Sequence, residues 1–384
     1  MKNRVLAAAA ALAFNLALSG AAHADISVTD VLGRTVKVPE VPKRVVLGFY
    51  YEDYLAIVGP EAIDKVVALS LSTWKDWRPQ QYARYEAALP RLKKLPDVGS
   101  TEDSSFSVEK VIAADPDLLI LGAWNYDTIG ESIKQLEAAG IPIVVLDYNA
   151  QTIEKHVQST MALGKLMGQE QRARQLADQY TQAMQDIEQR IGKQKPSPKK
   201  VYVELAQNGP GTVGNSYGNS MWGALVTQLG GQNIAAGQVG NWGPLSPEYV
   251  LDQQPDLVFL AGSEWLNKPQ AVNLGFGAEP AQTRERVAAY TRRTGWDMLP
   301  AVKQGQVHGI YHGGARTLSD YVYAQYIAKQ LYPDAFADVD PAQNLRDFYR
   351  QWLPIPADGV FMMQHQPAAK APVTSKHGSS QGNP

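Results

Sequence analysis

The sequence predicts an α/β protein with two α/β lobes bridged by a single long α-helix and a ligand cleft between the lobes. Short β-branched runs alternate with helical patterns along most of the chain, which is typical of parallel sheets covered by helices. The middle stretch, residues 170–191, repeats apolar residues at helical spacing and contains neither glycine nor proline. On either side of it, the segments SVEKVIAADPDLLIL at 107–121 and SPEYVLDQQPDLVFL at 246–260 match each other without a gap.

The first lobe is expected to span residues 25–168. It opens with segments 26–28 and 35–38, which predict a β-hairpin around Leu32-Gly33. The apolar runs that follow predict buried strands at 44–47, 65–69, 117–121 and 142–146. Helices are expected between them at 52–58, 107–114 and 128–139, and Gly140 stands where a glycine commonly ends a helix.

The bridging helix is expected at residues 169–194, inside a helical region that begins at Thr152 and is divided by Gly164 and Gly168. At 1.5 Å per residue, the range 170–191 would extend for about 33 Å. The second lobe, residues 195–365, repeats the strand and helix pattern of the first. Its strands are expected at 200–205, 256–260 and 306–310, and its helices at 220–229, 247–253, 284–290, 318–331 and 341–352.

The two matched segments predict the same local structure in each lobe. Ser107 and Ser246 each precede a short helix as N-cap residues, and a Pro-Asp turn and a buried strand follow. Glu109 and Glu248 therefore occupy equivalent positions in the first helical turn. A carboxylate there is favoured by the helix dipole by about 0.3–1 kcal/mol, which is a purely structural explanation. Alternatively, one carboxylate per lobe could meet basic pockets on a two-fold symmetric membrane partner.

Composition excludes several functional classes. The 384 residues include 36 Lys+Arg and 38 Asp+Glu, so the formal charge of −2 gives no support for a nucleic-acid partner. There is no cysteine, which excludes disulfides, iron–sulfur clusters, cysteine zinc sites and thiol nucleophiles. We expect a monomer without a cofactor.

Both ends of the chain predict segments outside the fold. Lys2 and Arg4 precede an apolar run at 5–18, and Ala22-His23-Ala24 forms a cleavage site, so residues 1–24 are expected to be a signal peptide. No cysteine follows to carry a lipid, and we expect an exported, periplasmic protein. Residues 366–384 are poor in apolar residues and predict a disordered tail.

Several segments resemble the periplasmic substrate-binding proteins of the siderophore, haem and cobalamin import systems. They are DVLGRTVKVPEVPKRVV at 30–46, the two S-x-E-x-V-x4-PDL segments, LPDVGS at 95–100 and QLGGQNIA at 228–235. The block at 319–354 is similar to a branch that handles iron complexes or oxyanions. The resemblance implies a binding protein that delivers its ligand to an ABC permease dimer in the inner membrane, with Glu109 and Glu248 docking onto permease arginines.

Aromatic and cationic residues follow the predicted strands, where open α/β sheets bind ligands. Tyrosine and tryptophan offer an apolar face and a polar tip, while a guanidinium binds carboxylates and oxyanions with two hydrogen bonds. The structural alternative is core packing for the aromatic residues and a surface salt bridge for Arg316. The candidate ligand-binding residues are Tyr50, Tyr51, Trp74, Trp77, Arg78, Trp124, Tyr126, Tyr217, Trp242, Trp265, Tyr311, His312 and Arg316.

The two arginines and the many aromatic residues suit a small anionic metal chelate, of which a ferric siderophore is the favoured example. Molybdate or another oxyanion, haem and cobalamin remain alternatives. A direct metal site is less favoured. His308 and His312 would align as ligands only on a helix, whereas His308 is expected in a strand and His312 in the turn after it. Tyr311 and His312 are the candidates if the iron is coordinated directly.

One motif points to an enzyme instead. Residues 214–218, GNSYG, match the G-x-S-x-G nucleophile elbow, with Ser216 followed along the chain by Asp256 and His308 or His312. That motif requires a buried strand directly before it, whereas QNGPG precedes it here. A binding protein is therefore preferred to a secreted serine hydrolase.

Overall fold

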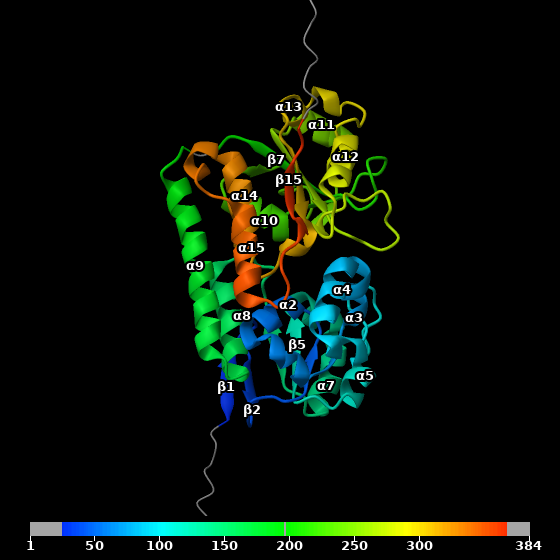
Figure 1. Ribbon diagram of the computed structural model, residues 1–384, viewed down its shortest axis with the longest axis vertical. Coiled ribbons are helices and arrows are strands. Elements are labelled where there is room, and N and C mark those ends of the chain that lie inside the picture. The colour runs from blue at the N-terminus through cyan, green and yellow to red at the C-terminus, as the bar shows by residue number, and fades with distance from the viewer. Residues whose placement is uncertain (1–24, 196, 367–384) are drawn as a thin grey trace, which may run out of the picture.

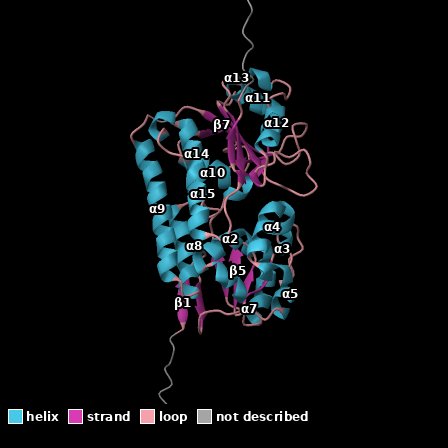
Figure 2. Cartoon of the chain, viewed as in Figure 1, coloured by secondary structure: helices cyan, strands magenta, loops and turns pink. Residues whose placement is uncertain are grey.

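The computed structural model describes residues 25–195 and 197–366, in which the chain forms two α/β lobes (Figure 1). The expected signal peptide and nearly all of the expected tail lie outside these residues. Helix α9 (Glu170–Gly192) runs along one side of both lobes. Strands lie inside a layer of helices in each lobe (Figure 2). In the part of the chain that is described, no helix combines the length and the apolar character needed to cross a membrane.

The N-terminal lobe contains a parallel sheet with the strand order β4-β3-β5-β6. Its strands, β3 (Val45–Leu47), β4 (Val66–Leu69), β5 (Leu118–Gly122) and β6 (Ile143–Leu146), agree with the four predicted strands to within one residue at each end. They are almost entirely buried, as expected for continuous apolar runs covered on both faces. The predicted hairpin is also confirmed, as β1 (Ile26–Thr29) pairs antiparallel with β2 (Thr35–Val38).

The helices of this lobe are α2 (Tyr51–Val58), α3 (Leu71–Trp77), α4 (Pro79–Ala88), α5 (Val108–Ala113), α6 (Ala123–Ile129) and α7 (Ile133–Ala138). The single helix predicted at 128–139 is wrong. Gly130 has a φ of 54°, which ends α6 and separates it from α7. Helices α3 and α4 were not predicted, because few of their residues are apolar and Pro79 interrupts the helical pattern.

The two lobes are linked by α8 (Ile153–Leu166) and α9, which pack against each other. The chain turns between them at Gly168, which has a φ of 67°. Gly164 does not divide the helices, contrary to expectation. It lies inside α8, where a side chain would collide with Ala173 of α9, so its role is close helix packing.

The C-terminal lobe has a five-stranded sheet with the order β15-β13-β11-β7-β9. The predicted strands correspond to β7 (Lys200–Leu205), β11 (Leu257–Gly262) and β13 (Val307–Tyr311), which run parallel. The edge strands β9 (Gln232–Asn233) and β15 (Met362–Gln364) were not predicted, and β15 is antiparallel. The short strands β8 (Asn215–Tyr217) and β10 (Trp242–Pro244) pair separately, as do β12 (Gly275–Phe276) and β14 (Gly359–Val360).

The helices of this lobe are α10 (Met221–Gln228), α11 (Pro247–Gln253), α12 (Pro280–Tyr290), α13 (Pro300–Lys303), α14 (Tyr321–Leu331) and α15 (Pro341–Trp352). Helix α14 begins three residues later than predicted. Residues 318–320 instead form tight turns, in which Asp320 donates its backbone N–H to the Thr317 carbonyl, and Leu318 donates its own to Asp53 of the other lobe at 2.7 Å.

A second buried hydrogen bond, from Tyr349 to Glu52, joins the lobes near this point. The Glu52 carboxylate of α2 accepts hydrogen bonds from Tyr85 at 2.7 Å and from Tyr349 of α15 at 2.8 Å, and a third from Gln81 at 2.6 Å. Burial raises the pKa of Glu52, and these three donors oppose that shift. The lobes are therefore held together by polar bonds as well as by α9.

Candidate functional site

Arg316 reaches from the C-terminal lobe into an aromatic pocket of the N-terminal lobe. It follows β13, and its guanidinium carbon lies 4.7 Å from the ring centre of Phe49 and 5.2 Å from that of Trp124. Phe49 follows β3 and Trp124 follows β5, so the carboxyl ends of strands from both lobes meet here. Cation–π contacts of this kind stabilise a cation that has lost its water. The predicted positions of Arg316 and Trp124 therefore do come together.

The polar environment of Arg316 is incomplete. Its side chain is 8% exposed, and its nearest carboxylate is Glu102, with Nη1 3.7 Å from Oε1. The buried Nε has no hydrogen-bond partner. Burial lowers the pKa of Arg316, and Glu102 opposes that shift. The backbone φ of Arg316 is 59°, a left-handed conformation that is uncommon outside glycine and is associated with functional sites.

A second cation, Arg78, lies at the same place. It stands between α3 and α4 of the N-terminal lobe, and in the described chain its side chain forms no hydrogen bond or ion pair. Burial, then Arg316 and Arg78, hold the pKa of His312 well below its usual range. Both guanidiniums thus act on one neutral imidazole. Glu102 lies beside Arg316, and the charge of Arg78 lowers the pKa values of three further carboxyl groups near it, Glu52, Asp53 and Glu264.

Three aromatic candidates of the C-terminal lobe line the same region. The Tyr217 hydroxyl lies 3.3 Å from His312 Nδ1, and the Trp265 ring centre lies 6.0 Å from that of His312. The Tyr311 hydroxyl is buried without a hydrogen-bond partner. These residues supply polar tips and flat apolar faces beside the two arginines.

The lobes touch at the mouth of the cleft. The Ser263 hydroxyl donates to the Trp77 carbonyl at 3.0 Å, and the backbone N–H of Gln80 donates to Glu264 at 2.7 Å. The backbone N–H of Leu266 completes the contact by donating to the carbonyl of Asp76 at 2.9 Å. Burial raises the pKa of Glu264 to about 7. The two lobes are therefore in direct hydrogen-bonded contact at this point.

Two cavities flank this contact. An inner cavity of about 10 Å³, enough for one water molecule, is lined by Phe49, Tyr51, Thr73, Trp74, Trp77 and Arg78. An outer cavity of about 710 Å³ lies between Pro79 and Gln80 of the N-terminal lobe and residues 263–286 of the C-terminal lobe, with Trp265 among its lining residues. Its volume is in the range of small-molecule sites.

Several candidate residues have structural contacts. Trp74 is 2% exposed, stacks on Tyr51 with ring centres 4.6 Å apart, and donates its indole N–H to Gln81 at 2.8 Å. The Tyr50 hydroxyl accepts from the backbone N–H of Tyr148 at 3.1 Å. Trp74 and Tyr51 border the inner cavity, whereas Tyr50 packs edge-on against Trp124.

Two candidates lie apart from Arg78 and Arg316. Tyr126 of α6 packs beneath Arg34 of the hairpin turn, 4.4 Å from the guanidinium carbon to the ring centre, which explains this residue structurally. Trp242 of β10 is 58% exposed and faces no other candidate ring, although its strand pairs with that of Tyr217.

The sequence reasoning missed Phe49 and Glu102. Phe49 follows β3 directly, so the rule used for Tyr50 and Tyr51 could have identified it. Glu102 lies in the loop between α4 and α5 and carries no motif, so nothing local indicated that it would face Arg316.

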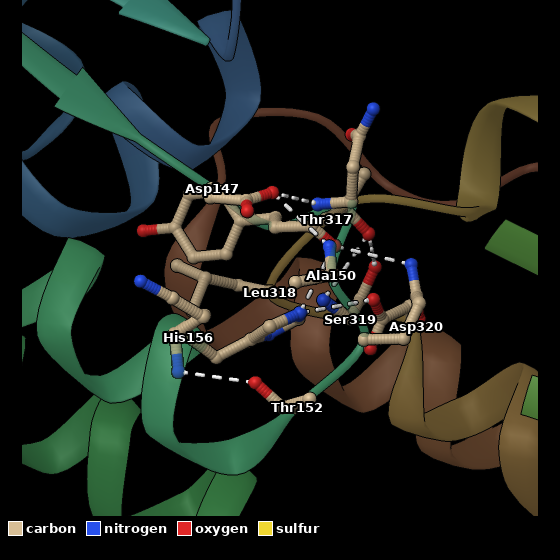
Figure 3. A network of polar contacts seen from close by, with 12 residues as sticks. Asp147, Ala150, Thr152, His156, Thr317, Leu318, Ser319 and Asp320 are labelled. Carbon is tan, nitrogen blue, oxygen red and sulfur yellow. Dashed lines mark hydrogen bonds and ion pairs between the residues drawn. The ribbon is translucent and has the colours of Figure 1, made fainter. Parts of the chain in front are cut away.

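The segment after Arg316 is anchored at the lobe junction (Figure 3). Asp320 Oδ2 lies 3.3 Å from His156 Nε2 of α8, and both side chains are almost fully buried. Burial holds the pKa of His156 at about 3, so the imidazole is neutral, and burial raises the pKa of Asp320 well above its usual range. The hydrogen bond that holds this segment to the N-terminal lobe is the one from the Leu318 backbone N–H to Asp53, at 2.7 Å.

Glu109 and Glu248 are exposed in the first turns of α5 and α11. Their N-caps are Ser107 and Ser246, whose hydroxyls accept from the backbone N–H groups three residues later, as predicted. The Glu109 carboxylate also accepts from Ser107 at 2.9 Å, and hydrogen bonds from its own backbone and from Ser107 lower its pKa.

The residues of the hydrolase hypothesis are in other contacts. Ser216 is fully buried and donates its hydroxyl to the Val203 carbonyl at 2.6 Å. Asp256 accepts from the backbone N–H of Lys200 at 2.8 Å, at the start of the strands rather than at their carboxyl ends. His308 lies 3.0 Å from the Tyr326 hydroxyl. In the described chain the Ser216 hydroxyl is thus bonded to a backbone carbonyl and not to Asp256, His308 or His312.

Comparisons with known proteins agree with this fold. A family model described as periplasmic binding protein matches residues 50–311. The TroA-like periplasmic binding protein FepB from Veillonella parvula is 33% identical with a TM-score of 0.83, and the match covers 88% of this chain and 99% of that one.

More distant relatives bind different ligands. The molybdate-binding protein MolA of Haemophilus influenzae is 24% identical over 357 residues, which covers 87% of this chain and 93% of MolA. The vitamin B12 binding protein BtuF of Vibrio cholerae is 18% identical with a TM-score of 0.56, and the match covers 77% of this chain and 99% of that one. At this identity the likeness to BtuF concerns the fold.

Proposed function

The chain belongs to the periplasmic binding protein family and is the substrate-binding component of an ABC importer, and on that premise we propose that its ligand is a small anionic iron complex held by Arg78 and Arg316. We further propose that residues 1–24 are removed on export and that the mature protein acts as a periplasmic monomer without a lipid anchor. Glu109 and Glu248 are proposed to dock it onto the permease.

The observation that carries the ligand class is the pair of poorly compensated guanidiniums. Arg316 is buried with an unpartnered Nε, and the half-buried Arg78 forms no side-chain hydrogen bond or ion pair in the described chain, although the charge of Glu52 acts on it. A buried charge whose hydrogen-bonding groups are not all partnered is costly, so the unpartnered Nε of Arg316 favours a ligand group of opposite charge beside it. Guanidiniums bind carboxylates and oxyanions with paired hydrogen bonds. Such groups surround the iron in many ferric chelates.

Arg78 lines the inner cavity and Trp265 the outer one, so a chelate that used both would extend from Arg78 toward the cleft mouth. Trp265 lines the outer cavity and also lies beside His312, so it connects the two regions. The inner cavity is small, and a molybdate-like oxyanion would need the least widening of it. An oxyanion is therefore the second candidate, and it would leave the outer cavity unused.

The decisive experiment is a binding titration. We would follow tryptophan fluorescence while adding ferric complexes of carboxylate and catecholate chelators, and molybdate, to the wild type, Arg78→Ala and Arg316→Ala. Loss of one charged hydrogen bond costs about 1.5–3 kcal/mol, which corresponds to a weakening of roughly 10- to 150-fold. The matched control is Arg350→Ala, which removes an exposed arginine paired with Asp347.

The wild type should bind at least one of these anions, and only the two cleft variants should lose affinity. Unchanged affinity in both cleft variants would refute the proposed site. Binding of the chelates but not of molybdate would favour the iron complex, and the opposite result would favour the oxyanion.

A further inference from the structure

We propose that Glu102 is an internal counter-ion, which takes the place of ligand charge beside Arg316 and sets how strongly the cleft prefers more highly charged anions. This inference rests on the proposed anion-binding function of the cleft. It assigns a specificity-determining role to a residue that no pattern in the sequence indicated.

The geometry places Glu102 opposite Arg316 across the cleft. Glu102 belongs to the N-terminal lobe and Arg316 to the C-terminal lobe, and 3.7 Å separates Oε1 from Nη1. That distance is an ion pair without a close hydrogen bond, so the pair leaves donors of Arg316 free. The guanidinium therefore keeps hydrogen-bonding capacity for a ligand while Glu102 remains nearby.

Glu102 is held in this position by its own lobe. The same Oε1 accepts the indole N–H of Trp124 at 2.7 Å, and the backbone N–H of Glu102 donates to the Ser100 hydroxyl at 3.1 Å. Next to it, Thr101 accepts from Asn125 at 2.5 Å. Trp124 also packs against Arg316, so one ring positions both the cation and its counter-ion.

The charge balance determines the effect on ligands. Glu102 is the carboxylate beside Arg316, whereas the carboxyl groups coupled to Arg78 are Glu52, Asp53 and Glu264, whose pKa values are raised by burial. Repulsion between Glu102 and a bound anion grows with the charge of the anion, as Coulomb's law requires. Removal of the Glu102 charge should therefore strengthen binding of a dianion more than that of a monoanion of the same shape.

Glu102→Gln isolates this charge. The amide oxygen of glutamine can still accept the Trp124 N–H, so the loop keeps its anchor while the negative charge is lost. The control is Glu131→Gln, which removes an exposed carboxylate of the same lobe that pairs with Lys134. The probes are molybdate and perrhenate, which are tetrahedral oxyanions with charges of −2 and −1.

Affinity is measured by calorimetry and by the anion-induced rise in melting temperature. We expect Glu102→Gln to bind molybdate at least tenfold more tightly than the wild type and to gain less for perrhenate. Weaker binding in Glu102→Gln would overturn the inference, because it would make Glu102 a ligand contact. Equal gains for both probes would overturn it as well.

A double-mutant cycle tests the ion pair without any ligand. Glu102→Gln, Arg316→Ala and the double variant are unfolded with urea. The unfolding equilibrium constant of the double variant should differ at least threefold from the value expected if the two single effects were independent. No coupling would overturn the counter-ion role. If Arg78→Ala and Arg316→Ala leave anion binding unchanged while the coupling is present, the proposed function fails and the ion pair does not.

Discussion

Asp53 offers a test of how the buried lobe junction limits stability. It lies in α2, is 3% exposed, and accepts the backbone N–H of Leu318 at 2.7 Å, two residues after Arg316. Burial raises the pKa of Asp53 from 3.8 to about 7, with a smaller contribution from Glu52, while the Leu318 bond and the charge of Arg78 oppose the shift. Asp53→Asn should keep the acceptor for Leu318 and remove the charge.

The sign of the pH effect follows from linkage. Because the folded-state pKa is raised, the folded protein binds the proton more tightly than the unfolded chain. The resulting stability is complete below about pH 4 and is lost as the pH rises through about 7. Each pKa unit is worth about 1.4 kcal/mol, so the rise of the Asp53 pKa from 3.8 to about 7 corresponds to a loss of folding stability of at most about 4 kcal/mol.

The assay is urea unfolding of the wild type and Asp53→Asn at pH 5 and pH 8. We expect the variant to be more stable than the wild type by about 1–3 kcal/mol at pH 8 and by less at pH 5. The control is Asp178→Asn, which replaces an exposed aspartate on α9. Equal pH dependence of stability in the wild type and Asp53→Asn would refute the reasoning.

Two further predictions concern the ligand and the permease. Tyr311→Phe should change ligand affinity by about 1 kcal/mol or less if the iron stays wrapped in its chelate. A visible phenolate-to-iron charge-transfer band that disappears in this variant would instead show direct coordination. Glu109→Ala/Glu248→Ala should leave ligand affinity unchanged and lower uptake more than either single change, with about 1–3 kcal/mol lost for each desolvated pair. Normal uptake at normal expression would make both glutamates helix-start residues only.

Elements that depend on local pattern were predictable. The strands β3, β5 and β11 are continuous apolar runs, and their burial follows from parallel pairing. The repeat around Ser107 and Ser246 was also predictable, because capping and helix initiation act within a few residues.

Contacts between distant segments were not predictable in the same way. Tyr126 and Trp124 are two residues apart on α6, yet Tyr126 packs under Arg34 and Trp124 faces Arg316. A strand-end rule cannot separate them, because neighbouring helical residues point to different faces. Trp74 likewise matched the rule, but its ring stacks on Tyr51 and its indole N–H is bonded to Gln81.

By itself the sequence determined the α/β class, the two-lobe repeat and the long helix, because these follow from hydrophobic periodicity, capping and chain punctuation. Only the tertiary structure decided which side chains meet in the cleft. The pairing of Glu102 with Arg316 joins residues of different lobes, and their 3.7 Å separation depends on how the lobes pack around α9 and α15. Charge compensation across a cleft is a property of three-dimensional proximity, which spacing along the chain does not encode.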